Sequence, residues 1–262
     1  DFTFLCLPDA AAIESATLCT NPKTRIIDAS TAHRINPAWA YGFPELDKAF
    51  RDKIATSNRV AVPGCYASGS NAILYPLVKS KIMQKDYPVV IHAVSGYSGA
   101  GKKAIAQYED KNRNPELDSP RLYALTQTHK HLPEMKKISN LEYEPIFNPY
   151  ICDYIQGMSV TVGLHSRILN KKVTAKEVCD MFKQHYEGAR FVKVADFMGD
   201  GILTEQFIAA NTLKDTNEMQ IFIYGNDDRI MITSRFDNLG KGASGAAIQC
   251  LNIMLGCDEG KG

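Results

Sequence analysis

The segment MSVTVGLHSRI, residues 158–168, decides the fold of the second half of the chain, because its apolar and polar residues alternate. The apolar residues that share one side of an extended chain are Met158, Val160, Val162, Leu164 and Ile168. Polar residues occupy most of the other side. Successive side chains of a strand point to opposite faces, so this pattern predicts an antiparallel strand with one buried face.

The neighbouring segments extend this sheet. Two apolar runs in residues 219–236 flank Gly225-Asn226-Asp227-Asp228, a sequence typical of a hairpin turn. Upstream, Thr174 and Glu177 form a capping box that predicts the start of a helix. The final segment, 240–255, begins with glycines and continues as an apolar helix. The second half therefore predicts an α+β unit with an antiparallel or mixed sheet and a closing helix.

The first half has a different pattern. Short apolar runs at 3–7 and 25–29 are separated by a helix-compatible stretch, and a third run covers 59–62. These runs indicate buried strands of a parallel α/β sheet. From Ser70 the apolar residues follow helical spacing, and Pro76 is expected to kink or divide that helix.

Composition excludes several classes of protein. The 262 residues include 30 basic and 29 acidic side chains, and the net charge is +1. No basic run with interleaved aromatics is present, so we expect neither a nucleic-acid nor a membrane partner. No stretch approaches the roughly 18 apolar residues of a membrane span. We expect a soluble, cytoplasmic protein. The seven cysteines contain no C-x-x-C pair, which argues against a disulfide framework or a zinc ribbon.

One cysteine has an unusual setting. Cys65 lies in VAVPGCYASGSN, residues 61–72, between a Pro-Gly turn and the start of a predicted helix. Unpaired N–H groups and the helix dipole favour the thiolate at such a position. A free cysteine is more often a buried, inert residue. Here the small residues on both sides leave room for a substrate, which favours a nucleophile.

A cysteine nucleophile needs a group that handles protons, and THKHLPEM, residues 128–135, contains His129 and His131. In an extended segment both side chains face the same way, so both can point into one site. The H-x-H spacing is also typical of metal ligands. A metal site needs further ligands, and none is marked by sequence proximity.

Two glycine-rich segments follow predicted strands. SGYSGAGKK, residues 95–103, matches the phosphate-binding pattern G-x-x-x-x-G-K, but Lys103 stands where that loop needs a Ser or Thr hydroxyl. We interpret it as an anion or cofactor loop. DNLGKGASGAA, residues 237–247, is a second such loop. Its alternative role is a plain turn that lets the last helix pack closely.

Ordered across the chain, these stretches resemble a known enzyme family. The blocks that carry the resemblance are FLCLPD, IIDASTAHR, YGFPEL, PGCY, AVSGYSGAGK, HKHLPEM, QGM and DNLGKGASGAA. The chain resembles the N-acetyl-γ-glutamyl-phosphate reductases in their shorter, type 2 form. It is similar, more distantly, to the aspartate-semialdehyde dehydrogenases and the phosphorylating glyceraldehyde-phosphate dehydrogenases.

The resemblance implies an enzyme of arginine biosynthesis. It implies a dinucleotide-binding domain, residues 1–64 and 240–262, and a catalytic and dimerisation domain, residues 65–239. In this scheme Cys65 attacks N-acetylglutamyl phosphate, phosphate leaves, and NADPH reduces the thioester to the semialdehyde. His131 is the expected acid and base, and His129 supports it or holds the substrate. No metal is required, and a homodimer or homotetramer is expected.

The same resemblance assigns further residues. Those expected beside the cofactor are Leu7, Pro8 and Ser30 at its diphosphate, Ser95, Gly96 and Gly99 at the nicotinamide, and Asn238 and Gly242 at the amide. Arg34 is expected to contact the phosphate group of the substrate. Glu45 is expected to support substrate binding by shaping the site.

One part of the family pattern is missing. The chain lacks the first strand and its glycine-rich dinucleotide loop, so the Rossmann-like domain is partial, without its first βα unit. The opening residues read as the middle of a sheet, so we expect the native chain to extend upstream. The residues that distinguish NADP from NAD are not marked. Alternative activities are an aspartate-semialdehyde type of dehydrogenase, a cofactor-independent cysteine hydrolase or acyltransferase, and a non-catalytic binding protein. The two glycine-rich loops favour the reductase.

Overall fold

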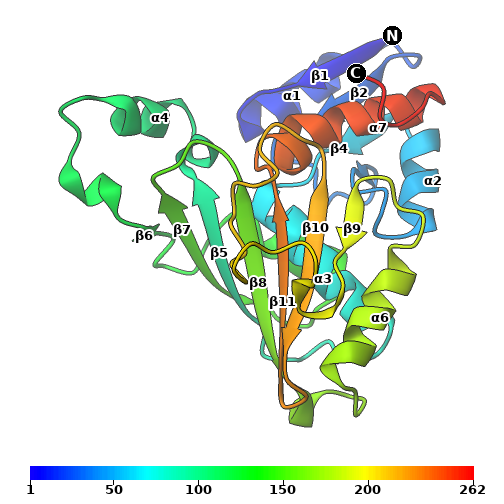
Figure 1. Ribbon diagram of the computed structural model, residues 1–262. Coiled ribbons are helices and arrows are strands. Elements are labelled where there is room, and N and C mark those ends of the chain that lie inside the picture. Colours follow the sequence, from blue (N-terminus) through cyan, green and yellow to red (C-terminus); the bar gives the residue numbers. More distant parts are fainter.

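The computed structural model describes residues 1–262 and contains two β-sheets (Figure 1). The smaller sheet has the order β1-β2-β4-β3, and all of its pairings are parallel. Its strands are β1 (Phe2–Leu5), β2 (Arg25–Asp28), β3 (Ala40–Tyr41) and β4 (Arg59–Ala61). The prediction of parallel strands near 3–7, 25–29 and 59–62 is confirmed.

The carboxyl edge of this sheet carries the predicted site segments. Helix α1 (Asp9–Leu18) follows β1, and helix α2 (Lys48–Thr56) follows β3. Helix α3 (Cys65–Lys79) follows β4 directly. Because all four strands run in the same direction, the turns that follow β1, β2 and β4 leave the sheet at the same edge, where ligands of open α/β sheets bind.

The larger sheet has seven strands in the order β6-β7-β5-β8-β11-β10-β9. Its strands are β5 (Val90–Gly96), β6 (Arg121–Leu122), β7 (Ile146–Cys152), β8 (Met158–His165), β9 (Val192–Val194), β10 (Met219–Gly225) and β11 (Arg229–Phe236). Strand β8 pairs antiparallel with β5 and β11, whereas β5 pairs parallel with β7. The sheet is therefore mixed, and the predicted hairpin is confirmed as β10 and β11.

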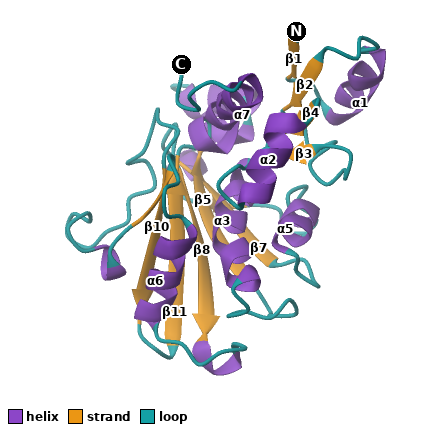
Figure 2. Ribbon diagram, turned by 90° about the vertical axis from the view of Figure 1, so that its right-hand side faces the viewer, coloured by secondary structure: helices purple, strands orange, loops and turns teal.

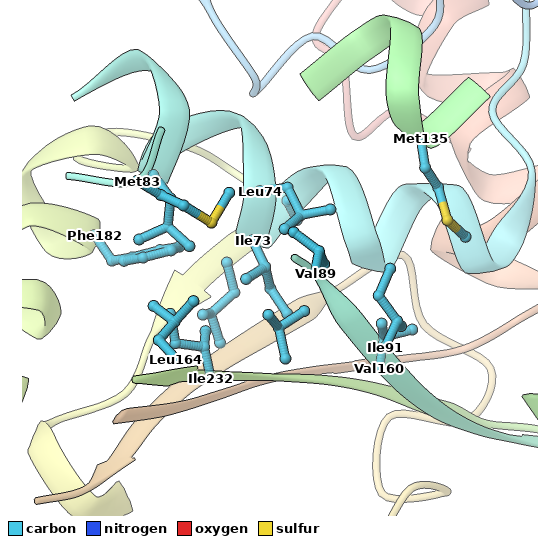
Figure 3. Packing of buried hydrophobic residues seen from close by; sticks show 14 of the residues in the cluster. Ile73, Leu74, Met83, Val89, Ile91, Met135, Val160, Leu164, Phe182 and Ile232 are labelled. Carbon is cyan, nitrogen blue, oxygen red and sulfur yellow. The ribbon is translucent and has the colours of Figure 1, made fainter. Parts of the chain in front are cut away.

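The main core lies between this sheet and helices on one of its sides. Figure 2 shows α3 and α5 (Leu132–Ser139) on that side, and α6 (Ala175–His185) contacts β9 and β10 and adds Val178 and Phe182 to the same core. Figure 3 shows Ile73 and Leu74 of α3 over Val160 and Leu164 of β8. The alternation predicted for β8 is confirmed up to Leu164. The prediction for Ile168 is wrong, because the strand ends at His165 and Ile168 lies in the short helical turn η3 (Ser166–Ile168), 41% exposed.

Pro76 does not divide α3, which runs unbroken from Cys65 to Lys79, and the alternative expectation of a kink stays a prediction. A proline inside a helix leaves the carbonyl four residues earlier without its usual N–H donor. In this structure the Tyr186 hydroxyl donates to the Ala72 carbonyl oxygen at 2.8 Å, so the missing bond is replaced by one from outside the helix. The capping box of Thr174 and Glu177 at the start of α6 is confirmed.

The last helix connects the two sheets. The turn η5 (Gly240–Ser244) contacts α3 and β11, and α7 (Gly245–Leu255) packs against α2 and β2 (Figure 1). The remaining elements are α4 (Lys102–Glu109) and the short turns η1 (Tyr97–Ala100), η2 (Pro115–Asp118) and η4 (Phe197–Gly199). None of the helices has both the length and the apolar character needed to cross a bilayer. The two domain boundaries stay a prediction.

Candidate active site

Cys65 is the first residue of α3, and Gly64 is the N-cap of that helix. The thiol is half-buried. Burial raises its pKa, and the Glu134 carboxylate acts in the same direction. The Tyr66 N–H group and the charges of Arg34 and Lys130 lower that pKa, but they do not outweigh burial. The helix start does favour the thiolate, as expected, through the Tyr66 N–H group, but desolvation is the larger effect and the net shift in pKa is upward.

The two histidines flank Tyr66 and form a compact group. Their ring centroids are 4.7 Å apart with the planes nearly perpendicular. They do not lie in an extended segment as expected, because His131 is the N-cap of α5 and the residues before it form a turn. The His131 backbone N–H donates to His129 Nδ1 at 3.2 Å, so this turn brings the two rings together.

His131 lies nearer than His129 to the helix start that carries Cys65. A methyl group on Gly64 would lie 2.7 Å from His131 Cδ2 and still closer to Nε2. The other ring nitrogen, Nδ1, is buried without a hydrogen-bond partner. Burial, followed by the charge of Arg34, holds the pKa of His131 well below its usual range. Burial also lowers the pKa of His129 to about 4. Both rings are therefore neutral at pH 7.

A buried carboxylate connects the two halves of the site. Glu134, three residues after His131, accepts hydrogen bonds from Tyr41 Oη at 2.7 Å and from the Gly64 N–H at 2.9 Å. Arg34 donates to the other Glu134 oxygen at 3.3 Å. Burial raises the pKa of Glu134, and Arg34 opposes that shift. Because Glu134 contacts the N-cap of α3, it positions the helix start that carries Cys65.

Sequence reasoning missed Glu134, although one signal was available. Glu134 falls between Leu132 and Met135, which are both buried, so it lies on the apolar side of α5. An acidic residue on the buried side of a short helix requires a partner.

We expect Gly64→Ala to lower kcat by about 100-fold with little loss of folded protein, because misplacing a catalytic group by about 1 Å costs about that much. Gly64 has φ −73° and ψ 144°, which alanine adopts without strain. The added methyl group would lie 2.5 Å from an Arg34 guanidinium nitrogen and would collide with the His131 ring. Steady-state kinetics and a thermal melt check this. Gly163→Ala is a matched control, because its methyl group meets only the flexible Met231 side chain. Unchanged kcat in Gly64→Ala would contradict the geometry.

The glycine-rich loop after β5 meets the segment after β11. Asn238 Nδ2 donates to Ser98 Oγ at 3.0 Å. A methyl group on Gly99 would lie 3.0 Å from Ser95 Oγ and 3.4 Å from Asn238 Nδ2. Gly96 has a different constraint, because a methyl group there would lie 2.6 Å from the backbone oxygens of residues 154 and 155. Close chain packing therefore explains Gly96 without any cofactor.

The second glycine-rich loop lies directly against the nucleophile. A methyl group on Gly242 would lie 2.9 Å from Cys65 Cβ. The Gly242 N–H donates to the Asp237 carbonyl oxygen at 2.9 Å, next to Asn238. The Asn238 side-chain oxygen accepts from the Gly157 N–H at 2.8 Å. Asn238 retains one N–H and one lone pair for a further amide partner. That Ser95, Gly96, Gly99, Asn238 and Gly242 lie beside a bound nicotinamide stays a prediction.

Leu7, Pro8 and Ser30 lie at the carboxyl edge of the smaller sheet. Leu7 and Pro8 are exposed between β1 and α1. Ser30 follows β2, and its hydroxyl donates to Asp28 Oδ2 at 2.7 Å. Their place beside the cofactor diphosphate, which the family resemblance implies, stays a prediction.

Glu45 lies between β3 and α2. Its side chain is buried, and its Oε1 accepts from Lys241 Nζ at 2.7 Å and from Gln249 Nε2 at 2.8 Å. Its predicted part in substrate binding stays a prediction. Among all 262 residues, no three His, Cys, Asp or Glu side chains are grouped as a metal site.

Comparison with known proteins identifies the class to which this protein belongs. The sequence model of the semialdehyde dehydrogenase dimerisation domain matches residues 65–238. The aspartate semialdehyde dehydrogenase of Francisella tularensis superposes with a TM-score of 0.72 at 16% identity, over 97% of this chain and 82% of that one. The aspartate semialdehyde dehydrogenase II of Vibrio cholerae gives 0.71 at 15% identity, over 97% and 79%. The fold is that of the semialdehyde dehydrogenases.

The sequences of curated relatives identify the family within this class. N-acetyl-gamma-glutamyl-phosphate reductase 2 of Pseudomonas putida is 42% identical over 266 residues, covering 100% of this chain and 83% of that protein. The protein of the same name from a Nostoc species is 41% identical, covering 99% and 83%. The chain therefore belongs to the N-acetyl-gamma-glutamyl-phosphate reductase family. The resemblance found in the sequence blocks is confirmed, and the chain is an oxidoreductase.

Proposed function

We propose that this chain reduces N-acetyl-γ-glutamyl phosphate to N-acetylglutamate 5-semialdehyde with release of phosphate, an NADPH-dependent step of arginine biosynthesis. Family membership supports the reaction. The single structural observation that supports the mechanism is the start of α3, where Gly64 lies against the His131 ring and the next residue, Cys65, lies against Gly242.

Cys65 and His131 form a neutral pair at rest, because burial raises the pKa of the thiol and lowers that of the imidazole. When the Cys65 sulfur attacks the acyl carbon, His131 takes the thiol proton and phosphate leaves with the bonding electrons. The products are a Cys65 thioester and an imidazolium. A neutral histidine is the form required for this step.

The second half of the reaction uses the same proton. Gly99, Asn238 and Gly242 would hold the nicotinamide of NADPH, which would supply the hydride that the thioester carbon needs. His131 donates its proton to the thioester carbonyl oxygen as that oxygen becomes negative. When the C–S bond breaks, His131 takes this proton back and returns it to the Cys65 sulfur. His129 holds the His131 backbone in place through its Nδ1.

Arg34 is the proposed contact for the substrate phosphate. Its Nε donates to the Val62 carbonyl oxygen at 2.8 Å and a terminal nitrogen donates to the Ala29 carbonyl oxygen at 3.1 Å. These bonds fix the guanidinium beside Gly64. A guanidinium held in this way presents its remaining N–H bonds to an anion at low entropic cost.

We also propose that the chain functions as a homodimer or homotetramer. The matched family domain is a dimerisation domain. The face of the larger sheet away from α3 carries hydroxyl groups, such as the Thr161 and Thr233 pair at 2.8 Å, and offers a subunit interface.

The reverse reaction tests the proposed activity. With N-acetylglutamate 5-semialdehyde, phosphate and NADP⁺, we expect absorbance at the wavelength of NADPH to rise, and omission of phosphate to stop the rise. Aspartate semialdehyde under the same conditions is the matched substrate control, for which we expect turnover at least about 100-fold slower. Release of phosphate from the acyl phosphate without any nicotinamide would indicate a hydrolase instead.

A further inference from the structure

Lys241 is a buried lysine with no part in the mechanism above. It lies in turn η5 and is only 2% exposed. Its Nζ donates to Glu45 Oε1 and to Gln249 Oε1, each at 2.7 Å. The ammonium also lies 5.1 Å from the ring centroid of Phe43 and 5.6 Å from that of Phe191. Burying an ammonium group is costly unless it is paired and hydrogen-bonded, and both conditions are met here.

The partners of Lys241 come from separate parts of the chain. Glu45 lies in the loop between β3 and α2, and Gln249 lies in α7. Gln249 Nε2 donates to Glu45 Oε1 at 2.8 Å and to Glu259 Oε2 at 3.0 Å. Glu259 in turn accepts from Arg51 of α2 at 2.9 Å. Two positive and two negative side chains are thus linked, and the network attaches η5 to α2, α7 and the segment after α7.

The next residue along the turn contacts the nucleophile. Gly242 lies so close to Cys65 that a methyl group on it would be 2.9 Å from Cys65 Cβ. The short turn from 240 to 242 therefore has the buried ion pair on one side and Cys65 on the other. A displacement of Lys241 therefore moves Gly242, which lies against Cβ of Cys65.

We propose that Lys241 and Glu45 are positioning residues, whose buried ion pair holds the glycine turn of residues 240–244 against Cys65. Lys241 does not contact the reacting atoms, because its ammonium is buried against Glu45, Gln249 and two aromatic rings. The ion pair acts through Gly242, which sets the space beside the thiol. The expected effect on turnover rests on the proposed function, whereas the expected effect on the thiol does not.

Alkylation of Cys65 by iodoacetamide in the full chain, followed by peptide mass spectrometry, tests the proposal. In Lys241→Met we expect Cys65 to react about 10-fold faster than in the unmodified chain, because the turn no longer lies against it. Cys6, which is exposed between β1 and α1 and outside this network, serves as the internal reference and keeps its rate. Cys179, which is buried in α6, stays protected and reports that the fold is intact.

Two results would overturn the proposal. One is an unchanged Cys65 rate. The other is equal acceleration of Cys65 and Cys179, which would show general loosening of the fold. Lys241→Met leaves Glu45 buried without its cation, so the double variant Lys241→Met/Glu45→Gln, in which no buried charge is unpaired, is measured beside it. In the double variant we expect the same 10-fold acceleration of Cys65.

Kinetics give a second readout. In both variants we expect kcat to fall about 10- to 100-fold with KM within about threefold of the unmodified chain, because the reacting groups are misaligned while the substrate contacts remain. A raised KM with unchanged kcat would contradict positioning. If the unmodified chain lacks reductase activity, the proposed function fails, and the alkylation result still decides the role of Lys241.

Discussion

Cys65→Ser is expected to lower kcat for the reduction by at least about 10⁴-fold, because a serine hydroxyl is a far weaker nucleophile than a thiol at neutral pH. Burial raises the pKa of the thiol already, and a neutral His131 activates it only by accepting its proton. A hydroxyl in the same place releases its proton much less readily. The measurement is the absorbance of NADPH during turnover.

The matched control for this change is Cys257→Ser. Cys257 is exposed beyond α7 and is one of the seven free cysteines, so the same substitution there is expected to leave kcat unchanged. Mass spectrometry adds a direct test. Incubation of the unmodified chain with the acyl phosphate and no cofactor is expected to add one N-acetylglutamyl group to the Cys65 peptide. Turnover that survives in Cys65→Ser, or a label on another cysteine, would rule out the thioester.

The local features of the fold were predictable because they depend on neighbouring residues. The alternation of 158–164 assigned the buried face of β8, and Thr174 with Glu177 marked the start of α6. The order of the larger sheet was not predictable in this way. Strand β5 lies between β7 and β8, which both come more than fifty residues later in the chain. Pro76 shows the same limit, because the donor that replaces its missing bond is Tyr186, which lies 114 residues after the acceptor Ala72.

In the site, too, local features could be predicted and contacts between distant residues could not. Turn chemistry at residues 63–70 identified the position of Cys65, because a helix start can be recognised from the sequence. Glu134 could not be assigned a role, because its partners Arg34, Tyr41 and Gly64 are 100, 93 and 70 residues away. The direction of the Cys65 pKa shift could not be predicted from the sequence either. It depends on how much protein surrounds Cys65, and Gly242 of η5, nearly 180 residues later, lies against its Cβ.

His131→Asn is expected to lower kcat by about 10²- to 10⁴-fold and to leave KM within about threefold, because a lost proton-transfer group affects the chemical step. The pH profile provides a second readout. Burial and the Arg34 charge hold the pKa of His131 well below its usual 6.5, so the ring stays neutral as the pH falls through 6.5. The unmodified chain should therefore keep its kcat/KM between pH 7.5 and 6. The fall of kcat/KM on the acid side should begin at a lower pH than an ordinary histidine would give. In His131→Asn, the part of this fall that comes from protonation of His131 should be absent.

His129→Asn is the matched control, because it makes the same substitution two residues away. His129 Nδ1 accepts the His131 backbone N–H, so its loss loosens the turn without removing the acid and base. We expect it to lower kcat by less than about 10-fold, and to leave the acid side of the pH profile in place. A large loss in His129→Asn with normal turnover in His131→Asn would reverse the two assignments. If both variants lost kcat to the same large extent and had a raised KM, both rings would hold the substrate. The proton-transfer role predicts a large loss of kcat for only one of the two.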